Sequence, residues 1–327
     1  AGSLTRIVST HPVGYSEEPT MLIGVVHWVR LFHGLAAHPL VPEKDVPRYH
    51  DMLARITGPG ATYAQCAFLQ SWLLVGGKID ENLSEKEITK RYFSGLNEIG
   101  TSASDNPSRY SKVTMTINVP WQPNQIHPQA IELIRSAKSS VDMEFPYLVL
   151  DDIIESASDI ARKGRATRVL LPGISIDPVA EEAVRRIHYG QYLGMLRSGV
   201  DIHEYVADRN TGGTECGYDH GKIIIADIDE PTTRVKIDTG NYEPVLSGGP
   251  SGGILFDMSA VIETQDDTLK KQLKRTIATD FSAARSKKID EADVTKMSLL
   301  KKSSIKVLTW VANFIFPSSF SRTSQLS

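Results

Sequence analysis

The chain is poor in cysteine, with only Cys66 and Cys216 in 327 residues. Two cysteines exclude a disulfide-rich scaffold and a zinc cluster built on thiolates, and they leave room for one disulfide at most. Cys216 lies just before His220, but no second thiolate or HxxxH spacing accompanies it. We therefore expect an ordinary loop cysteine there rather than a metal ligand.

Long hydrophobic runs and an excess of charge are also missing. No stretch of 18 apolar residues is present, so no segment has the pattern of a membrane-spanning helix. The net charge is −3 and the pI about 6.3, which does not indicate a nucleic-acid-binding protein. What the chain does have is a globular composition, with 41% hydrophobic residues, and enough length for one large or two ordinary domains.

Helices and strands alternate regularly from residue 128 onward. The pattern predicts helices at 128–138, 151–163, 178–197 and 268–285, and strands at 140–148, 167–171, 201–206, 222–227, 235–239 and 255–262. Such alternation is typical of βαβ units with a mostly parallel sheet covered by helices. The predicted fold class is therefore α/β.

The first 123 residues are less regular. They predict strands at 4–9, 21–31, 51–57 and 113–119, and helices at 61–75 and 84–92. The segment from Pro120 to Pro123 is the best domain boundary in the chain. We accordingly predict three parts, at 1–123, 124–290 and 291–327.

The third part contains a basic amphipathic stretch. Its apolar residues recur at helical spacing after a group of lysines, and the pattern stops at Pro317 (Lys301, Lys302, Lys306, Val307, Leu308, Val311, Phe314, Ile315). We expect this helix to pack on the body of the protein, as apolar helical stripes usually do. Peripheral contact with a membrane surface is the alternative.

One short stretch concentrates the residues that could do chemistry. His220 and Lys222 lie two positions apart at the start of an apolar strand, so they point to the same side of it. An imidazole can attack phosphorus or move a proton, and an ammonium can neutralise the non-bridging phosphoryl oxygens. Asp227 follows at the end of the strand, and Asn241 lies in the turn after the next one.

The pattern His-x-Lys-x4-Asp resembles the signature of the phospholipase D superfamily. The resemblance extends over about 126–285, since the stretches 131–148, 162–172 and 196–202 are similar to the family's opening helix and strands and arrive in the expected order. The family's glycine before Thr239 is Asp238 here. The resemblance implies a fold of two similar halves, each giving one motif to a shared site.

The resemblance also implies a mechanism and roles for these residues. His220 would attack phosphorus or protonate the leaving alcohol, Lys222 and Asn241 would hold the phosphoryl oxygens, and Asp227 would orient a site residue or act structurally. The intermediate would be a phosphohistidine. No metal and no cofactor would be needed, because lysine and asparagine side chains supply the electrostatic stabilisation.

The first half should carry a second motif, and only a degenerate one is found. His11 stands where the motif histidine belongs, but Val13 replaces its lysine and Glu18 its aspartate. The strands that precede the motif in a full half are also missing. The partner histidine would therefore come from His11, from a second copy of the chain, or from a further N-terminal piece.

Three functions remain open at this point. The first is a phosphodiesterase that hydrolyses or transfers the phosphatidyl groups of phospholipids, which is favoured because His38-Pro39-Leu40 and Gly58-Pro59 resemble lipid-active members. The second is a catalytically impaired module that binds lipid or protein. The third is a nuclease of the same superfamily, disfavoured by the acidic balance and the lack of a basic, aromatic-rich stripe.

Three further histidines of the second half have no ligand spacing to one another. These are His127, His188 and His203. We expect surface or packing roles for them rather than metal ligation.

Overall fold

The computed structural model describes residues 20–24, 49–50, 52–57, 59–74, 76–79, 82–92, 111–120, 122–173, 180–206, 218–242 and 256–295. The strands are β1 (Thr20–Gly24), β2 (Tyr49–His50), β3 (Leu53–Thr57), β4 (Lys112–Asn118), β5 (Ser140–Glu144), β6 (Ala166–Pro172), β7 (Asp201–Tyr205), β8 (Tyr218–Asp219), β9 (Ile223–Ala226), β10 (Thr233–Asp238), β11 (Asp257–Thr264) and β12 (Ser286–Lys288). The helices are α2 (Pro59–Leu74), α3 (Glu85–Tyr92), α4 (Ile126–Arg135), α5 (Asp151–Arg162), α6 (Ala180–Arg197), α7 (Asp267–Asp280) and α8 (Glu291–Thr295).

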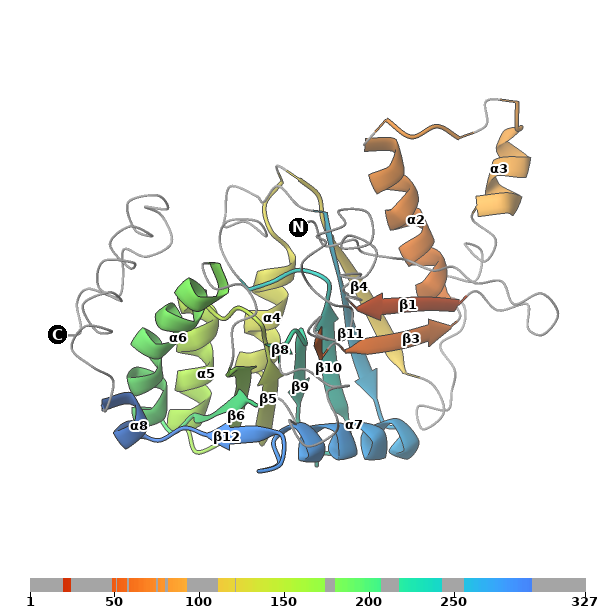
Figure 1. The fold of residues 1–327 in the computed structure, drawn as a ribbon. Coiled ribbons are helices and arrows are strands. Elements are labelled where there is room, and N and C mark those ends of the chain that lie inside the picture. The colour runs from red at the N-terminus through yellow and green to blue at the C-terminus, as the bar shows by residue number, and fades with distance from the viewer. Residues whose placement is uncertain are drawn as a thin grey trace.

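One large mixed sheet flanked by helices organises these elements (Figure 1), as the predicted α/β class requires. Its strand order is β12-β7-β6-β5-β9-β10-β11-β4. Only the β5–β6 and β6–β7 pairs are parallel, while the other pairs of this sheet are antiparallel. The expectation of a mostly parallel sheet is therefore wrong. The turn between β9 and β10 is too short for the crossover connection that parallel pairing needs.

Both faces of the sheet are buried under helices. On one face, alternate residues of β5, β6, β7 and β9 pack against α4, α5 and α6, around fully buried side chains such as Met143, Val169 and Ile224. On the other face, the intervening residues, among them Leu170, Ile223 and Val235, pack against α2 and α7. The period of two along each strand thus divides the core into two layers.

The helix ends follow their local chemistry. Asp266 caps α7, because its side chain accepts hydrogen bonds from the backbone N–H groups of Thr268 and Leu269. The chain turns after α5 and α6 at Gly164 and Gly199, whose φ values of 79° and 95° are those of left-handed backbone. Glycine reaches such angles without strain, so these positions stop the helices where the sequence predicts.

The first part of the chain contributes a smaller unit. β1 pairs with β3 in an antiparallel ladder, and α2 extends away from the sheet toward α3 (Figure 1). β4, however, pairs with β11 along its whole length and is a strand of the large sheet. The large sheet therefore includes a strand that precedes the boundary predicted at 120–123.

Several expectations fall on residues outside the described ranges. These are the strand at 4–9, the surroundings of His11, and all of the amphipathic tail beyond Thr295. Within the described part of the chain, no helix is long and apolar enough to cross a membrane. Cys66, on α2, is a free thiol whose pKa is raised by burial.

Candidate active site

The candidate site lies at the edge of the sheet where the parallel strands end. β5 ends at Glu144, and β9 starts beside it because Ile223 pairs with Glu144 in the antiparallel ladder. His220 and Lys222 immediately precede β9, and the turn with Asn241 follows β10, its other neighbour. The carboxyl ends of parallel strands are where α/β sheets bind ligands.

The structure brings His220 and Lys222 together as the sequence predicts. Lys222 Nζ lies 3.1 Å from each of the two ring nitrogens of His220 and donates to the carbonyl oxygen of His220 at 3.0 Å. Both side chains are buried, with 6% and 3% of their surface exposed. The backbone N–H of His220 donates to the carbonyl oxygen of His50 at 2.8 Å, which ties this segment to the first part of the chain.

Asn241 offers an amide group at the same edge. Its Oδ1 atom is buried and has no hydrogen-bond partner, whereas its backbone oxygen lies 3.4 Å from His127 Nε2. The turn that carries it is fixed on both sides. The backbone N–H of Asp238 donates to the carbonyl oxygen of Lys222, and Met258 N–H donates to Thr239 Oγ1.

A buried polar network holds the end of β10, from which this turn begins. The ammonium of Lys236 pairs with the carboxylate of Asp238 and donates to Ser259 Oγ at 2.7 Å. The hydroxyl of Tyr242 also donates to Asp238, and burial followed by this carboxylate raises the pKa of Tyr242 well above its ordinary value. Asp238 stands where the resembled family has glycine, and its role is that of the counter-ion to a wholly buried lysine.

Asp227 is not part of the site, and the catalytic role considered for it is corrected. It lies beyond the far end of β9, roughly 17 Å along the strand from Lys222 at about 3.3 Å per residue. Its Oδ1 accepts hydrogen bonds from the backbone N–H groups of Lys138 and Ser139 at 2.6 and 2.9 Å, and its Oδ2 pairs with Arg234 at 2.8 Å. These contacts anchor the turn before β5.

The other histidines have packing roles in the described structure. His127, His188 and His203 are buried, and His188 Nε2 accepts a hydrogen bond from the backbone of Leu148. Burial lowers the pKa of His127 to about 4. The predicted partner His11 lies outside the described residues, so its place relative to His220 stays a prediction.

Three ionisable side chains near His220, two of them buried and one partly exposed, were given no role by the sequence reasoning. Glu144 ends β5, whose sequence Ser-Val-Asp-Met-Glu alternates polar and apolar residues, so the signal that could have identified it is its burial and not a break in the pattern. Asp219 precedes His220, and its pKa is raised to about 7, chiefly by burial. His50 belongs to a two-residue strand, β2, which pairs with β8, and nothing in the sequence indicates that pairing.

Comparison with known proteins agrees with this architecture. A family model described as "Cardiolipin synthase, PLD-like domain" matches residues 130–242. No curated protein matches the chain.

Solved structures resemble the chain at low sequence identity. Phosphatidylserine synthase from Haemophilus influenzae Rd KW20 aligns with a TM-score of 0.54 and 11% identity, over 91% of this chain and 67% of the synthase. The phospholipase D family member Nuc from Salmonella typhimurium aligns with a TM-score of 0.40 and 15% identity, over 56% of this chain and 100% of Nuc. NucT from Helicobacter pylori aligns with a TM-score of 0.38 and 14% identity, over 52% of this chain and 95% of NucT.

The matched family segment contains β5 to β10, and with them every residue of the candidate site. The likeness to the synthase, at 11% identity, is one of fold. Residues 130–242 therefore match the PLD-like domain family, in the part of the chain where the sequence resemblance was found.

Proposed function

We propose that this protein is a phosphodiesterase of the phospholipase D type, which hydrolyses or transfers the phosphatidyl groups of phospholipids. The observation that carries the proposal is the buried His220–Lys222 pair at 3.1 Å, beside the unpartnered amide oxygen of Asn241, at the carboxyl edge of the sheet. The ammonium of Lys222 is held in place by the carbonyl oxygen of His220, and a phosphodiester bound there would bring an anion to it.

The proposed reaction has two displacements. A ring nitrogen of His220 attacks phosphorus, so a P–N bond forms while the bond between phosphorus and the leaving alcohol oxygen breaks. The leaving oxygen takes a proton from a general acid. Water or a second alcohol then attacks phosphorus and gives its proton to the deprotonated general acid, the P–N bond breaks, and both groups return to their starting states.

Lys222 and Asn241 would act on the charge that develops at phosphorus. The Lys222 ammonium is held by the carbonyl of His220, so it is already placed beside the attacking ring before substrate arrives. Such preorganised donors stabilise a transition state without reorganisation during the reaction. The amide of Asn241 would offer its N–H2 group to a second phosphoryl oxygen, with the orientation of the amide set by the ligand.

The general acid is the incomplete part of this site. In the superfamily it is expected to be a second histidine, and His11 is the candidate from this chain. A second copy of the chain or a separate N-terminal piece bearing a complete motif would serve the same purpose. The proposal therefore predicts that mixing with such a piece raises activity.

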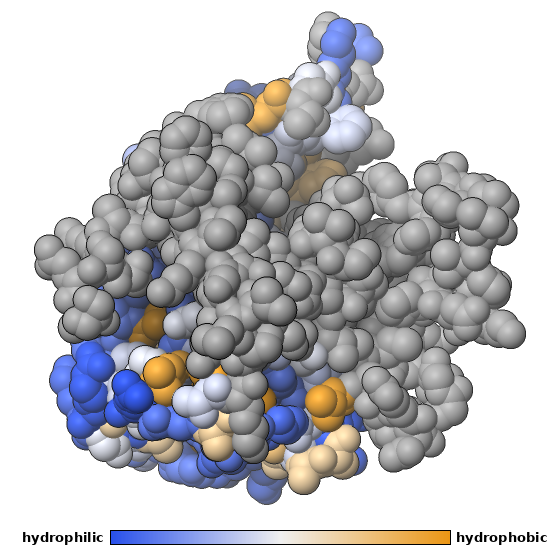
Figure 2. All heavy atoms as spheres, turned by 60° about the vertical axis from the view of Figure 1, so that its left-hand side comes forward, coloured by the Kyte–Doolittle hydropathy of each residue, from blue (hydrophilic) through white to orange (hydrophobic). Residues whose placement is uncertain are grey.

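The proposed partner is a phospholipid surface. The described residues of α2 include five exposed large hydrophobic side chains, which is unusual for a helix that faces water (Tyr63, Phe68, Trp72, Leu73, Leu74). Figure 2 shows a different face, on which the described residues are largely hydrophilic with isolated hydrophobic ones. Contact with lipid through α2 would bring the site close to its substrate.

The test is hydrolysis of phosphatidylcholine and phosphatidylglycerol vesicles by the wild type and by His220→Ala. The proposal predicts that His220→Ala lowers the rate at least about 1000-fold, because the nucleophile is removed. His203→Gln is the matched control, since it alters a buried histidine on β7 that contacts Ser286 and not the site. Equal inertness of wild type and His220→Ala would support a binding module instead. Cleavage of single-stranded DNA without lipid hydrolysis would indicate a nuclease.

A further inference from the structure

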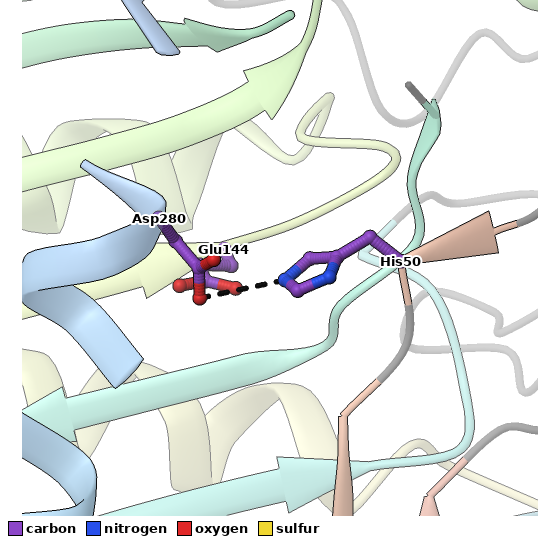
Figure 3. Close-up of side chains that lie close together, drawn as sticks. All are labelled: His50, Glu144 and Asp280. Carbon is purple, nitrogen blue, oxygen red and sulfur yellow. Dashed lines mark ion pairs between the residues drawn. The ribbon is translucent and has the colours of Figure 1, made fainter. Parts of the chain in front are cut away.

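A cluster of two buried side chains and one partly exposed side chain lies on the opposite side of the His220 strand segment. His50 from β2, Glu144 from the end of β5 and Asp280 from the end of α7 point toward one another (Figure 3). One ligand atom from each lies within 4.8 Å of the others, and His50 Nε2 is 3.4 Å from Asp280 Oδ2. Residues more than 200 positions apart in the sequence thus meet at one point.

Each carboxylate of this cluster has one buried oxygen that accepts no hydrogen bond within the described residues. Glu144 is only 2% exposed, and its Oε2 atom accepts no hydrogen bond in the described structure. The Oδ2 atom of Asp280, also 2% exposed, accepts none either and meets only the His50 ring. Buried carboxylates without donors are destabilising, so a group that binds them is expected.

A third carboxylate adds to the negative charge. A Cβ atom built at Gly221 would lie 3.1 Å from Glu144 Oε2 and 3.2 Å from Asp219 Oδ1, which places both carboxylates around the same small space. Asp219 is fully buried and its Oδ2 atom has no hydrogen-bond partner. Apart from His50, the nearby cations are Arg285, with Nη1 4.0 Å from Asp280 Oδ1, and Lys222, whose charge acts to lower the pKa of Asp219.

The pKa shifts in the cluster agree with this excess of negative charge. Burial and then Asp219 raise the pKa of Glu144 well above its ordinary value, and burial raises the pKa of Asp219 to about 7. A cation among these groups would replace protons as the compensating charge.

We propose that His50, Glu144 and Asp280 bind a divalent cation, with Asp219 as a further ligand or a hydrogen-bond acceptor for its water. Two ligand atoms on one ion with bonds of 2.1 Å lie about 3.4 Å apart in tetrahedral geometry. The separation of His50 Nε2 and Asp280 Oδ2 already has this value. The ligand atom of Glu144 lies within 4.8 Å of both, so a side-chain movement of at most about 1.4 Å would complete the set.

The ligand types indicate which cations fit. One imidazole nitrogen with two or three carboxylate oxygens suits Zn²⁺ or Mn²⁺ better than Mg²⁺ or Ca²⁺, which favour oxygen alone. This proposed cation site is distinct from the phosphoryl-transfer step, for which we expect that no metal is needed. The cluster lies on the α7 side of the sheet, whereas His220 and Lys222 lie on the other side of the same segment.

The site would act on the position of His220. His50 supplies a ligand through its ring and accepts the N–H of His220 through its carbonyl oxygen, and Asp219 is the neighbour of His220. A bound cation would therefore fix the β2–β8 pairing, which joins the first part of the chain to the catalytic strand. Metal binding is predicted whether or not the protein is a phosphodiesterase.

The test is direct binding by chelator-treated full-length protein, with Zn²⁺, Mn²⁺, Mg²⁺ and Ca²⁺ as separate probes. At a free metal concentration about 100-fold above Kd, Zn²⁺ or Mn²⁺ should raise Tm by about 5 °C. Glu144→Gln should weaken binding at least about 100-fold in calorimetry, and it should raise the Tm of the metal-free protein because it removes a buried carboxyl group whose ionisation is disfavoured. Asp280→Asn provides a second ligand variant in case Glu144→Gln does not fold.

The control is Glu263→Gln, which neutralises an exposed carboxylate paired with Lys112 on the surface. It should leave metal binding unchanged. The proposal is overturned if the wild type binds none of the four cations, or if Glu144→Gln and Asp280→Asn bind with the affinity of the wild type.

Discussion

Substitution of Asp227 tests whether this motif residue acts in stability or in catalysis. It is the third residue of the His-x-Lys-x4-Asp pattern, yet its carboxylate contacts the Lys138–Ser139 backbone and Arg234 rather than the site. We predict that Asp227→Ala destabilises the protein without changing the chemistry of the folded fraction. Asp227→Asn should have a smaller effect.

The magnitude follows from what each variant removes. Asp227→Ala deletes two charge-assisted hydrogen bonds to backbone N–H groups and leaves Arg234 without its carboxylate, at a cost of about 4 kcal/mol in the free energy of unfolding. It also places alanine at φ 63°, a left-handed angle that asparagine tolerates far better. Asp227→Asn retains an acceptor for the backbone and loses mainly the ion pair, so about 1–2 kcal/mol is expected.

Acid should reproduce part of this loss. Burial by itself would raise the pKa of Asp227, but the hydrogen bonds from Ser139, Arg234 and Lys138 outweigh it and hold the pKa below its ordinary value of 3.8. A carboxyl whose pKa is depressed on folding stabilises the protein above pH 3.8, and that stabilisation is lost as pH falls through the folded-state pKa.

The assay is urea unfolding of both variants, together with vesicle hydrolysis at a temperature where each remains folded. The reasoning predicts a lower unfolding midpoint, an unchanged m-value, and a rate per folded molecule within about twofold of the wild type. A stable Asp227→Asn protein with its activity abolished would refute it, since that result would assign Asp227 to the reaction.

Three further predictions concern the surroundings of the site. The pKa of His127 is about 4 in the folded state and 6.5 ordinarily, so the unfolded chain takes up a proton on this histidine at a higher pH than the folded protein does. The free energy of unfolding should therefore fall by about 3 kcal/mol from pH 6.5 to pH 4. Urea titrations of His127→Gln should show a smaller fall over this range. Gly240→Ala would place a Cβ atom 2.6 Å from the carboxylate of Asp257, so Tm should fall by the equivalent of about 1–3 kcal/mol, and an unchanged Tm would contradict this geometry. Lys222→Met should lower kcat/KM about 100- to 1000-fold with the fold retained by circular dichroism, whereas retained activity would remove the ammonium from the mechanism.

The regular part of the fold was largely readable from the sequence. Helix α5 and strands β6 and β7 lie within a residue or two of their predicted ranges, because glycines at 164 and 199 end the helices and the strands are short and apolar. Strand direction was not readable. Whether β9 runs parallel or antiparallel to β5 depends on the connection and on tertiary pairing, and the hydrophobic pattern is the same in both cases.

The candidate site was predicted only where its residues are close in sequence. The spacing of His220 and Lys222 on an extended segment determines their contact. Glu144, Asp280 and His50 reach their cluster from separate strands and a helix end, and no local pattern states which of these elements meet. For Asp227 the motif suggested a role in the same site as His220 and Lys222. The length of β9 places Asp227 at the other end of the strand, away from that site.

The central claim is that His220 is the nucleophile, and trapping its covalent intermediate tests this most directly. Wild-type protein would be mixed with short-chain phosphatidylglycerol, quenched at alkaline pH within one turnover, and analysed by peptide mass spectrometry. The account predicts a phosphatidyl adduct on the peptide that contains His220, absent from His220→Ala and retained in His203→Gln. Turnover by His220→Ala at the wild-type rate, or an adduct on another residue with none on His220, would contradict it.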